Sequence, residues 1–204
     1  HDEVVHLKCS MLGKMPGDKD DKFSNLKLAY AYMSGHPGKK LLFMGQEFGQ
    51  WNEWSEKKAL DWYLLEDPSH KELKEFTKAC MMLNKKYKCL YETDYSPEGF
   101  RWINANDRDN SGFIRISPDK KRHLLFVLNF TPVERMHHRI GVPIKGKYKL
   151  VLGDDLKNQK KTLTSIHGEC DGYKDSLLID LHRYGIAVYE FNGDVNAHKP
   201  TKIS

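Results

Sequence analysis

Residues 35–51 read GHPGKKLLFMGQEFGQW, and this stretch decides the expected fold of the chain. It opens with glycines and a proline, residues that end helices and form turns. Residues 41–44, LLFM, then run without polar alternation, which is typical of a strand covered on both faces in a parallel sheet. Polar and aromatic residues follow at once. The stretch therefore predicts the end of a helix, a buried strand, and a loop at the carboxyl end of that strand.

Helices are predicted on both sides of this strand. Upstream, apolar residues recur at spacings of three and four, at Phe23, Leu26, Tyr30 and Met33. Downstream, a second apolar stripe comprises Leu73, Phe76, Cys80, Leu83 and Tyr87. Asp20 and Asp21 are candidate caps for the first helix, and Asp67 or Ser69 for the second. A helix beside a buried strand is an α/β unit, so the second helix is expected to pack against the strand.

From about residue 95 the pattern changes to short β segments separated by Gly, Pro, Asn and Asp. Strands are predicted at residues 100–104, 112–116, 123–130, 138–142, 147–152, 177–181 and 186–191. Short strands with frequent turn signals predict an antiparallel β-sandwich. The expected organisation is a first part at residues 1–95, a sandwich at residues 96–192 and a polar tail at residues 193–204.

Composition limits the classes of function. The chain has 204 residues, of which 39% are hydrophobic, enough for one large domain or two small ones. Its net charge of +5 is modest, and the densest basic run, at residues 157–161, lacks Arg and aromatic residues, so we expect a solvated surface and no nucleic-acid partner. The four cysteines lie far apart without a Cys-x-x-Cys pair, which favours reduced thiols in a cytoplasm.

No membrane partner is expected, because no apolar run approaches the roughly 18 residues that span a bilayer. Residues 1–6, HDEVVH, contain neither an initiator Met nor a signal-peptide pattern, so the chain is expected to begin inside a larger protein.

Two motifs resemble metal sites only in part. Residues 107–112, DRDNSG, open like a calcium loop, but Pro118 stands where a bidentate Glu would close it, so a hairpin turn is expected. His137 and His138 have no carboxylate or third histidine at ligand spacing. The sequence also contains no nucleophile elbow and no glycine-rich phosphate loop. We therefore expect no metal and no cofactor.

Three clusters are candidates for a functional site. Gln46 and Glu47 follow the predicted strand directly, and active sites of α/β barrels form at the carboxyl ends of strands. The alternative is that Glu47 only anchors the loop. His1, Asp2 and Glu3 place a histidine beside two carboxylates, which is a weak signal on its own.

The third cluster is a group of tryptophans, Trp51, Trp54 and Trp62. They interleave with the polar residues Asn52, Glu53, Glu56 and Asp61. Indole rings stack on sugars and these polar groups bind hydroxyls, so the loop could line a glucan groove. Alternatively the tryptophans close the mouth of a barrel, which we favour for Trp62.

Taken together, these segments resemble the bacterial 1,4-α-glucan branching enzymes of the α-amylase superfamily. The resemblance is carried by residues 1–6 (HDEVVH), 15–18 (MPGD), 35–51, 60–62 (LDW), 97–100 (PEGF) and 129–132 (NFTP). It extends from residue 1 to about residue 192, and residues 35–51 distinguish branching enzymes from ordinary amylases.

The resemblance implies the end of a (β/α)₈ barrel at residues 1–95, followed by an antiparallel β domain. His1 would hydrogen-bond the sugar beside the cut, and Asp2 would be the carboxylate that stabilises the transition state. The family mechanism is retaining, and its nucleophile and acid/base lie upstream of this motif, so the chain alone is expected to be inactive. The implied partners are an α-1,4-glucan such as glycogen and the missing amino-terminal part of the enzyme.

One difference from the family lies in residues 6–10, HLKCS, where the family has His-Gly-Lys-Gly-Ser. Leu7 and Cys9 do not share glycine's access to positive φ, so the conformation of this loop is an open question. Two other functions stay open. One is another hydrolase of the superfamily, such as a trehalose-releasing enzyme that uses Asp2 with water as acceptor. The other is a glucan-binding β-sandwich without enzymatic activity.

Overall fold

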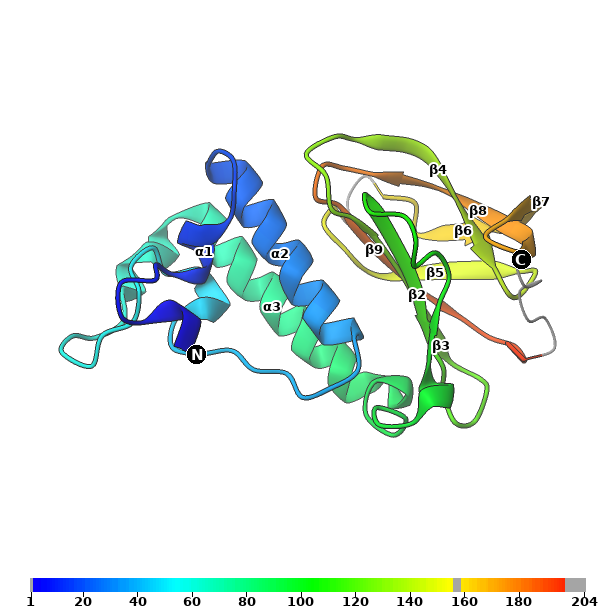
Figure 1. The fold of residues 1–204 in the computed structure, drawn as a ribbon, viewed down its shortest axis with the longest axis horizontal. Coiled ribbons are helices and arrows are strands. Elements are labelled where there is room, and N and C mark those ends of the chain that lie inside the picture. Colours follow the sequence, from blue (N-terminus) through cyan, green and yellow to red (C-terminus); the bar gives the residue numbers. More distant parts are fainter. Residues whose placement is uncertain (1, 156–158, 197–204) are drawn as a thin grey trace.

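The fold was analysed in a computed structural model, which describes residues 2–155 and 159–196. Two long helices lie side by side at one end of the molecule, and two antiparallel sheets form the other end (Figure 1). The helices and short turns are η1 (Asp2–Val4), α1 (Met11–Lys14), α2 (Lys19–Gly35), η2 (Gln46–Phe48), η3 (Trp62–Glu66), α3 (Pro68–Lys86), η4 (Lys88–Leu90) and η5 (Pro97–Gly99).

Local sequence signals define both long helices. Asp18 caps α2, since its side chain accepts a hydrogen bond from the Asp21 backbone N–H at 2.9 Å. The prediction that Asp20 or Asp21 caps this helix is therefore wrong by two or three residues; both lie in the first turn, where carboxylates suit the helix dipole. The predicted cap of α3 is confirmed, because Asp67 accepts from the Ser69 N–H at 2.9 Å.

The strand predicted at residues 41–44 is wrong. This segment has no strand conformation in the structure, and its Leu41 and Met44 side chains are 61% and 50% exposed. A strand requires backbone partners on a neighbouring strand, and residues 2–95 contain no strand at all. The helix α3 consequently packs against α2 and η2 and not against a strand at residues 41–44.

The sheets confirm an antiparallel sandwich. Within the described residues the strands are β1 (Phe100–Trp102), β2 (Asn110–Arg115), β3 (His123–Asn129), β4 (Arg135–Val142), β5 (Lys147–Gly153), β6 (Thr162–Thr164), β7 (Ile166–Cys170), β8 (Tyr173–Leu181) and β9 (Ile186–Phe191). The larger sheet has the order β1-β2-β3-β9-β5-β6, and the smaller has the order β4-β8-β7. The sequence prediction missed β6 and β7, which are short, largely polar edge strands.

The six-stranded sheet is buried on both faces. Its inner face packs against the three-stranded sheet, and its outer face packs against the two long helices. The outer core joins helix residues Leu28, Ala31, Cys80, Leu83 and Tyr87 to sheet residues Phe113, Leu124, Phe126, Leu128, Ile186 and Val188. The approach is close, because a Cβ on Gly35 would lie 2.5 Å from the Phe126 ring. The expected boundary at residue 95 therefore crosses a continuous hydrophobic core.

The start of the predicted polar tail packs against the sandwich. His123 Nε2 lies 2.8 Å from the Gly193 carbonyl oxygen, and Val195 is fully buried. The Arg101 guanidinium donates to the Val195 carbonyl at 2.9 Å and to the Asn196 side chain at 2.7 Å. Residues 193–196 thus belong to the folded part, and residues 197–204 lie outside the described residues.

Candidate functional site

The first candidate cluster opens the described chain. Asp2 begins η1, and His1 lies outside the described residues. Val4, the last residue of η1, is buried, with 3% of its surface exposed. This burial anchors the segment that follows the His-Asp motif.

The second cluster is a loop built around η2, between two glycines. Gly45 and Gly49 have φ angles of 82° and 71°, which a side chain would strain. Gln46 holds the loop from inside: its side-chain oxygen accepts from the Phe43 N–H at 3.0 Å, and its carbonyl accepts from the Tyr30 hydroxyl at 2.7 Å. The first role of Gln46 is therefore to anchor the loop.

Glu47 differs from its neighbour. It is half-buried, and its carboxylate forms no hydrogen bond or ion pair with any other residue that the structure describes. Burial, and secondarily the charge of Glu47, raise the pKa of the Tyr30 hydroxyl. The structure therefore assigns loop anchoring to Gln46, and the Glu47 carboxylate is available for a ligand.

The segment that follows the first cluster lies against the loop that holds the other two. The Trp54 N–H donates to the Val4 carbonyl at 3.2 Å. A small cavity beside this contact is lined by both segments, including Val4, Gln46 and Trp54. The segment after Asp2 and the loop at residues 44–54 are thus walls of the same cavity.

The three tryptophans of the loop have different surroundings. Trp51 is 37% exposed and meets the edges of Phe23 and His70, at ring distances of 6.1 and 5.9 Å. Trp62 lies 5.0 Å from the Phe48 ring and is 50% exposed, so the packing role favoured for it stays a prediction. Trp54 lies on Phe43 at 5.2 Å and lines an open groove that residues 5–7 also border. Trp54 is therefore best placed to face a ligand.

The polar residues of this loop serve mainly to fold it. Asn52 donates to the Asp61 carboxylate at 3.0 Å, and Glu53 accepts from two backbone amides. The buried Gln50, which the sequence analysis did not single out, accepts from the Asp61 N–H at 3.0 Å and donates to the Asn52 carbonyl at 3.1 Å. Glu53 therefore holds backbone amides, and Asn52 and Asp61 hold each other; that they bind sugar hydroxyls stays a prediction.

The loop at residues 6–10 adopts the conformation that its sequence disfavours. His6, Leu7 and Cys9 have φ angles of 60°, 64° and 65°. Left-handed backbone costs roughly 1–2 kcal/mol per non-glycine residue. The substitution of Leu and Cys for two glycines therefore leaves a strained loop beside the candidate site.

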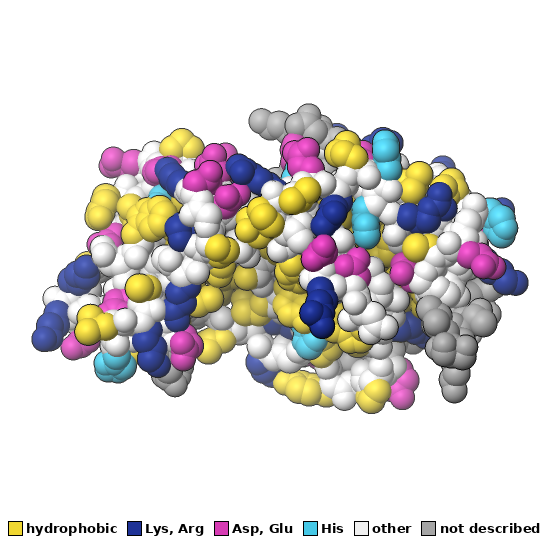
Figure 2. Space-filling view, turned by 45° about the horizontal axis from the view of Figure 1, so that its top comes forward, with side chains coloured by type: hydrophobic (Ala, Val, Ile, Leu, Met, Phe, Trp, Pro, Cys, Tyr) yellow, Lys and Arg dark blue, Asp and Glu magenta, His cyan; other side chains and the backbone are white. Residues whose placement is uncertain are grey.

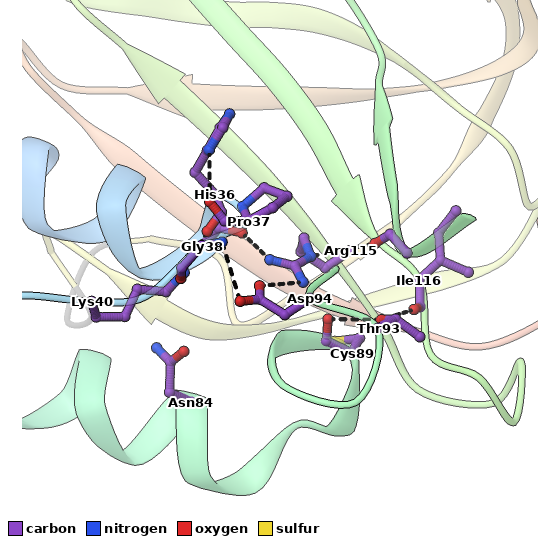
Figure 3. A network of polar contacts seen from close by, with 12 residues as sticks. His36, Pro37, Gly38, Lys40, Asn84, Cys89, Thr93, Asp94, Arg115 and Ile116 are labelled. Atoms are coloured by element: carbon purple, nitrogen blue, oxygen red, sulfur yellow. Dashed lines mark hydrogen bonds and ion pairs between the residues drawn. The ribbon is translucent and has the colours of Figure 1, made fainter. Parts of the chain in front are cut away.

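A buried polar network fixes residues 35–40, the segment that leads into the second cluster (Figure 3). The fully buried Arg115 on β2 donates to the Gly35 carbonyl at 2.7 Å and to Asp94 Oδ1 at 3.0 Å. The other Asp94 oxygen accepts from the Gly38 N–H at 3.1 Å. Lys40, whose pKa is lowered by burial, donates to the His36 and Gly38 carbonyls. Sequence reasoning missed this network, because its members are far apart along the chain.

A second missed feature is a group of aromatic rings where α2 meets β1. The members are Tyr32, His36, Phe100, Trp102, Phe113 and Phe130, with neighbouring ring centres 5.0 to 6.5 Å apart. Trp102 and Phe130 are 37% and 39% exposed. Exposed aromatic rings offer flat apolar faces to a ligand.

The charged surface favours no single ligand class. Figure 2 shows hydrophobic side chains gathered in the middle of one face, with basic and acidic side chains interspersed around them. In the basic run, Lys160 and Lys161 are exposed as predicted, and Lys157 lies outside the described residues.

Within residues 2–155 and 159–196, no helix is long and apolar enough to cross a membrane. The same ranges contain no cluster of His, Cys, Asp and Glu that could hold a metal ion. Asp107 instead accepts from two amides of the hairpin turn between β1 and β2, which confirms the predicted turn.

Comparison with known proteins identifies relatives. Residues 102–192 match the family described as alpha amylase, C-terminal all-beta domain. The chain is 47% identical over 201 residues to the 1,4-alpha-glucan branching enzyme GlgB of Butyrivibrio fibrisolvens, a match that covers 94% of this chain and 31% of the relative. It is 48% identical to the GlgB of Aquifex aeolicus over 77% of this chain and 25% of that protein. The chain thus spans about a third or less of the length of these relatives.

Solved structures resemble the fold. A trehalulose synthase variant matches with a TM-score of 0.57 and 12% identity, covering 92% of this chain and 42% of that one. The isomaltulose synthase of Klebsiella sp. LX3 matches with a TM-score of 0.55 and 11% identity, over 82% of this chain and 38% of that one. At these identities the likeness concerns the fold alone.

Proposed function

We propose that this chain is the carboxyl-terminal part of a 1,4-alpha-glucan branching enzyme. The premise is that it belongs to this family over the part that it covers. The enzyme would cut an α-1,4-glucan and transfer the freed chain to a 6-hydroxyl of glycogen, which makes an α-1,6 branch. The observation that carries the proposal is the cavity shared by Val4, Gln46 and Trp54, which joins the segment after Asp2 to the loop at residues 44–54. We also propose a cytoplasmic location, supported by four cysteines that are all unpaired.

We further propose that residues 1–95 are the end of a (β/α)₈ barrel and residues 96–192 its β-sandwich. The support is the exposure of Leu41 and Met44, together with an open apolar groove between α2 and α3. Tyr30, Met33, Leu42, Cys80 and Met81 line this groove. Parallel strands on either side of residues 41–44 would supply backbone partners and cover these apolar side chains.

In the proposed mechanism, a carboxylate nucleophile forms a glycosyl-enzyme intermediate, and a carboxylic acid protonates the leaving oxygen and later activates the 6-hydroxyl. We place both groups in a part of the enzyme outside these 204 residues. Asp2 would stabilise the positive charge at the anomeric carbon, and His1 would bind the adjacent sugar. Glu47, Trp51 and Trp54 would contact the glucan near this point, with Gln46 behind them.

The proposal predicts branching only when the missing carboxylates are supplied. The 204-residue chain alone should leave the iodine stain of amylose unchanged. The joined enzyme, in which the amino-terminal portion of the Butyrivibrio fibrisolvens relative precedes this chain, should make new α-1,6 branches, counted after debranching. The amino-terminal portion alone is the control. Reducing sugar without branches would favour the hydrolase alternative, and turnover by the chain alone would contradict the assignment of the missing groups.

A second function, glucan binding by the sandwich, is favoured by the aromatic rings around Trp102. Aromatic contacts of this kind contribute about 0.5–1.5 kcal/mol. Trp102→Ala should therefore weaken retention of the chain in a glycogen-containing gel by about 2- to 10-fold. Tyr63→Ala, which removes a 65% exposed ring far along the chain from this group, is the matched control. Equal retention of both variants and the unaltered chain would rule out binding through this surface.

A further inference from the structure

Glu53 holds the backbone segment that follows Asp2. Its Oε1 accepts a hydrogen bond from the Leu7 N–H and its Oε2 from the Lys8 N–H, each at 3.0 Å. The next residue, Trp54, donates its N–H to the Val4 carbonyl at 3.2 Å. Two consecutive residues of one loop therefore fix residues 4–8 of the other.

Few other interactions stabilise the backbone conformation at Leu7, so the hydrogen bonds to Glu53 matter there. Leu7 is 93% exposed, so apolar packing does not hold it, and its φ of 64° is unfavourable for leucine. Consecutive amides that point the same way form a concave site that prefers an anion. The Glu53 carboxylate fills this site with one oxygen for each amide, and charge-assisted hydrogen bonds of this kind are stronger than neutral ones.

Other charged groups near the segment bind it less directly. Glu3 pairs with Lys8 at 3.5 Å and with Lys14 at 3.3 Å, but its side chain is 72% exposed and such pairs are weak in water. The two bonds to Glu53 bind the backbone itself, at the Leu7 and Lys8 amides.

We propose that Glu53 is a positioning residue for the branching reaction, which fixes the backbone at Leu7 and Lys8 and so the loop that follows Asp2, the residue to which the proposed function gives the transition-state carboxylate. The inference rests on the proposed function. In this role Glu53 acts through the backbone, since each of its oxygens accepts from a backbone amide. It links the segment after Asp2 to the tryptophan loop, since Leu7 and Glu53 are 46 residues apart in sequence.

Hydrogen exchange in the 204-residue chain tests the contact itself. Glu53→Ala should speed exchange of the Leu7 and Lys8 amides by about tenfold or more, because each loses its acceptor. Glu53→Gln should have an intermediate effect, since its single amide oxygen cannot accept as two charged oxygens do. The Gly13 amide, bonded to Ser10 Oγ at 3.0 Å, is the internal reference, and Glu66→Gln is the matched control for charge removal. Unchanged exchange at Leu7 and Lys8 would overturn the proposal.

Kinetics of the joined enzyme test the positioning role. Glu53→Gln should lower kcat by about 10- to 100-fold and change KM for glucan by less than about twofold, since a displaced catalytic group affects the chemical step and not ground-state binding. Glu66→Gln should leave both constants unchanged. A rise in KM with unchanged kcat would overturn the positioning role and indicate a glucan contact. If the unaltered joined enzyme makes no branches, the proposed function fails and the positioning role fails with it, while hydrogen exchange still decides whether Glu53 holds the loop.

Discussion

Asp2→Asn is expected to lower the branching rate of the joined enzyme by at least about 100-fold. Positive charge develops at the anomeric carbon in the transition state, so a fixed carboxylate stabilises that state more than the ground state. Asn keeps the size of the side chain and removes its charge. The rate of appearance of α-1,6 branches measures the effect, and far-UV circular dichroism checks that the fold is retained.

His1→Ala is the comparison for this experiment. It removes a hydrogen bond to the sugar and leaves the Asp2 charge in place, so its effect on the rate should be smaller. An Asp2→Asn enzyme that retains most of its activity would show that the His-Asp motif of the family does not correspond to residues 1 and 2.

Arg115→Met is expected to lower the free energy of unfolding of the 204-residue chain by about 3–5 kcal/mol. The side chain of Arg115 is fully buried and that of Asp94 is 8% exposed, so the substitution leaves a buried carboxylate without its cation. It also leaves the Gly35 carbonyl, 2.7 Å from Arg115 Nη1, without this donor. Urea unfolding followed by circular dichroism and by tryptophan fluorescence measures the change. The two transitions should coincide, because the helices and the sheet share one core.

Two further variants make this result specific. Arg122→Met removes an arginine that pairs with Glu190 at 3.1 Å but is 47% exposed, and it should cost about 1 kcal/mol or less. Adding Asp94→Asn to Arg115→Met should recover part of the loss, because the unpaired buried charge is removed. If Arg115→Met costs no more than Arg122→Met, the network does not join the two halves of the molecule.

The sequence by itself determined the elements that depend on local interactions. The apolar stripes and the Asp67 cap defined α3, and the apolar runs within β3 and β9 identified buried strands. The positions of glycines predicted the turns. These inferences succeeded because helix caps, periodicity and turn residues act over a few neighbouring positions.

The tertiary structure decided what depends on partners far along the chain. Residues 41–44 have a strand-like composition, but no neighbouring strand supplies hydrogen bonds within the described part, so they form no strand. The edge strands β6 and β7 exist only because β5 and β8 pair with them. Glu53 and Arg115 looked like ordinary charged residues in the sequence. Their partners lie 46 and 80 residues away, at Leu7 and Gly35, and only the folded chain brings the half-buried Glu53 carboxylate and the buried Arg115 cation to the groups that bind them.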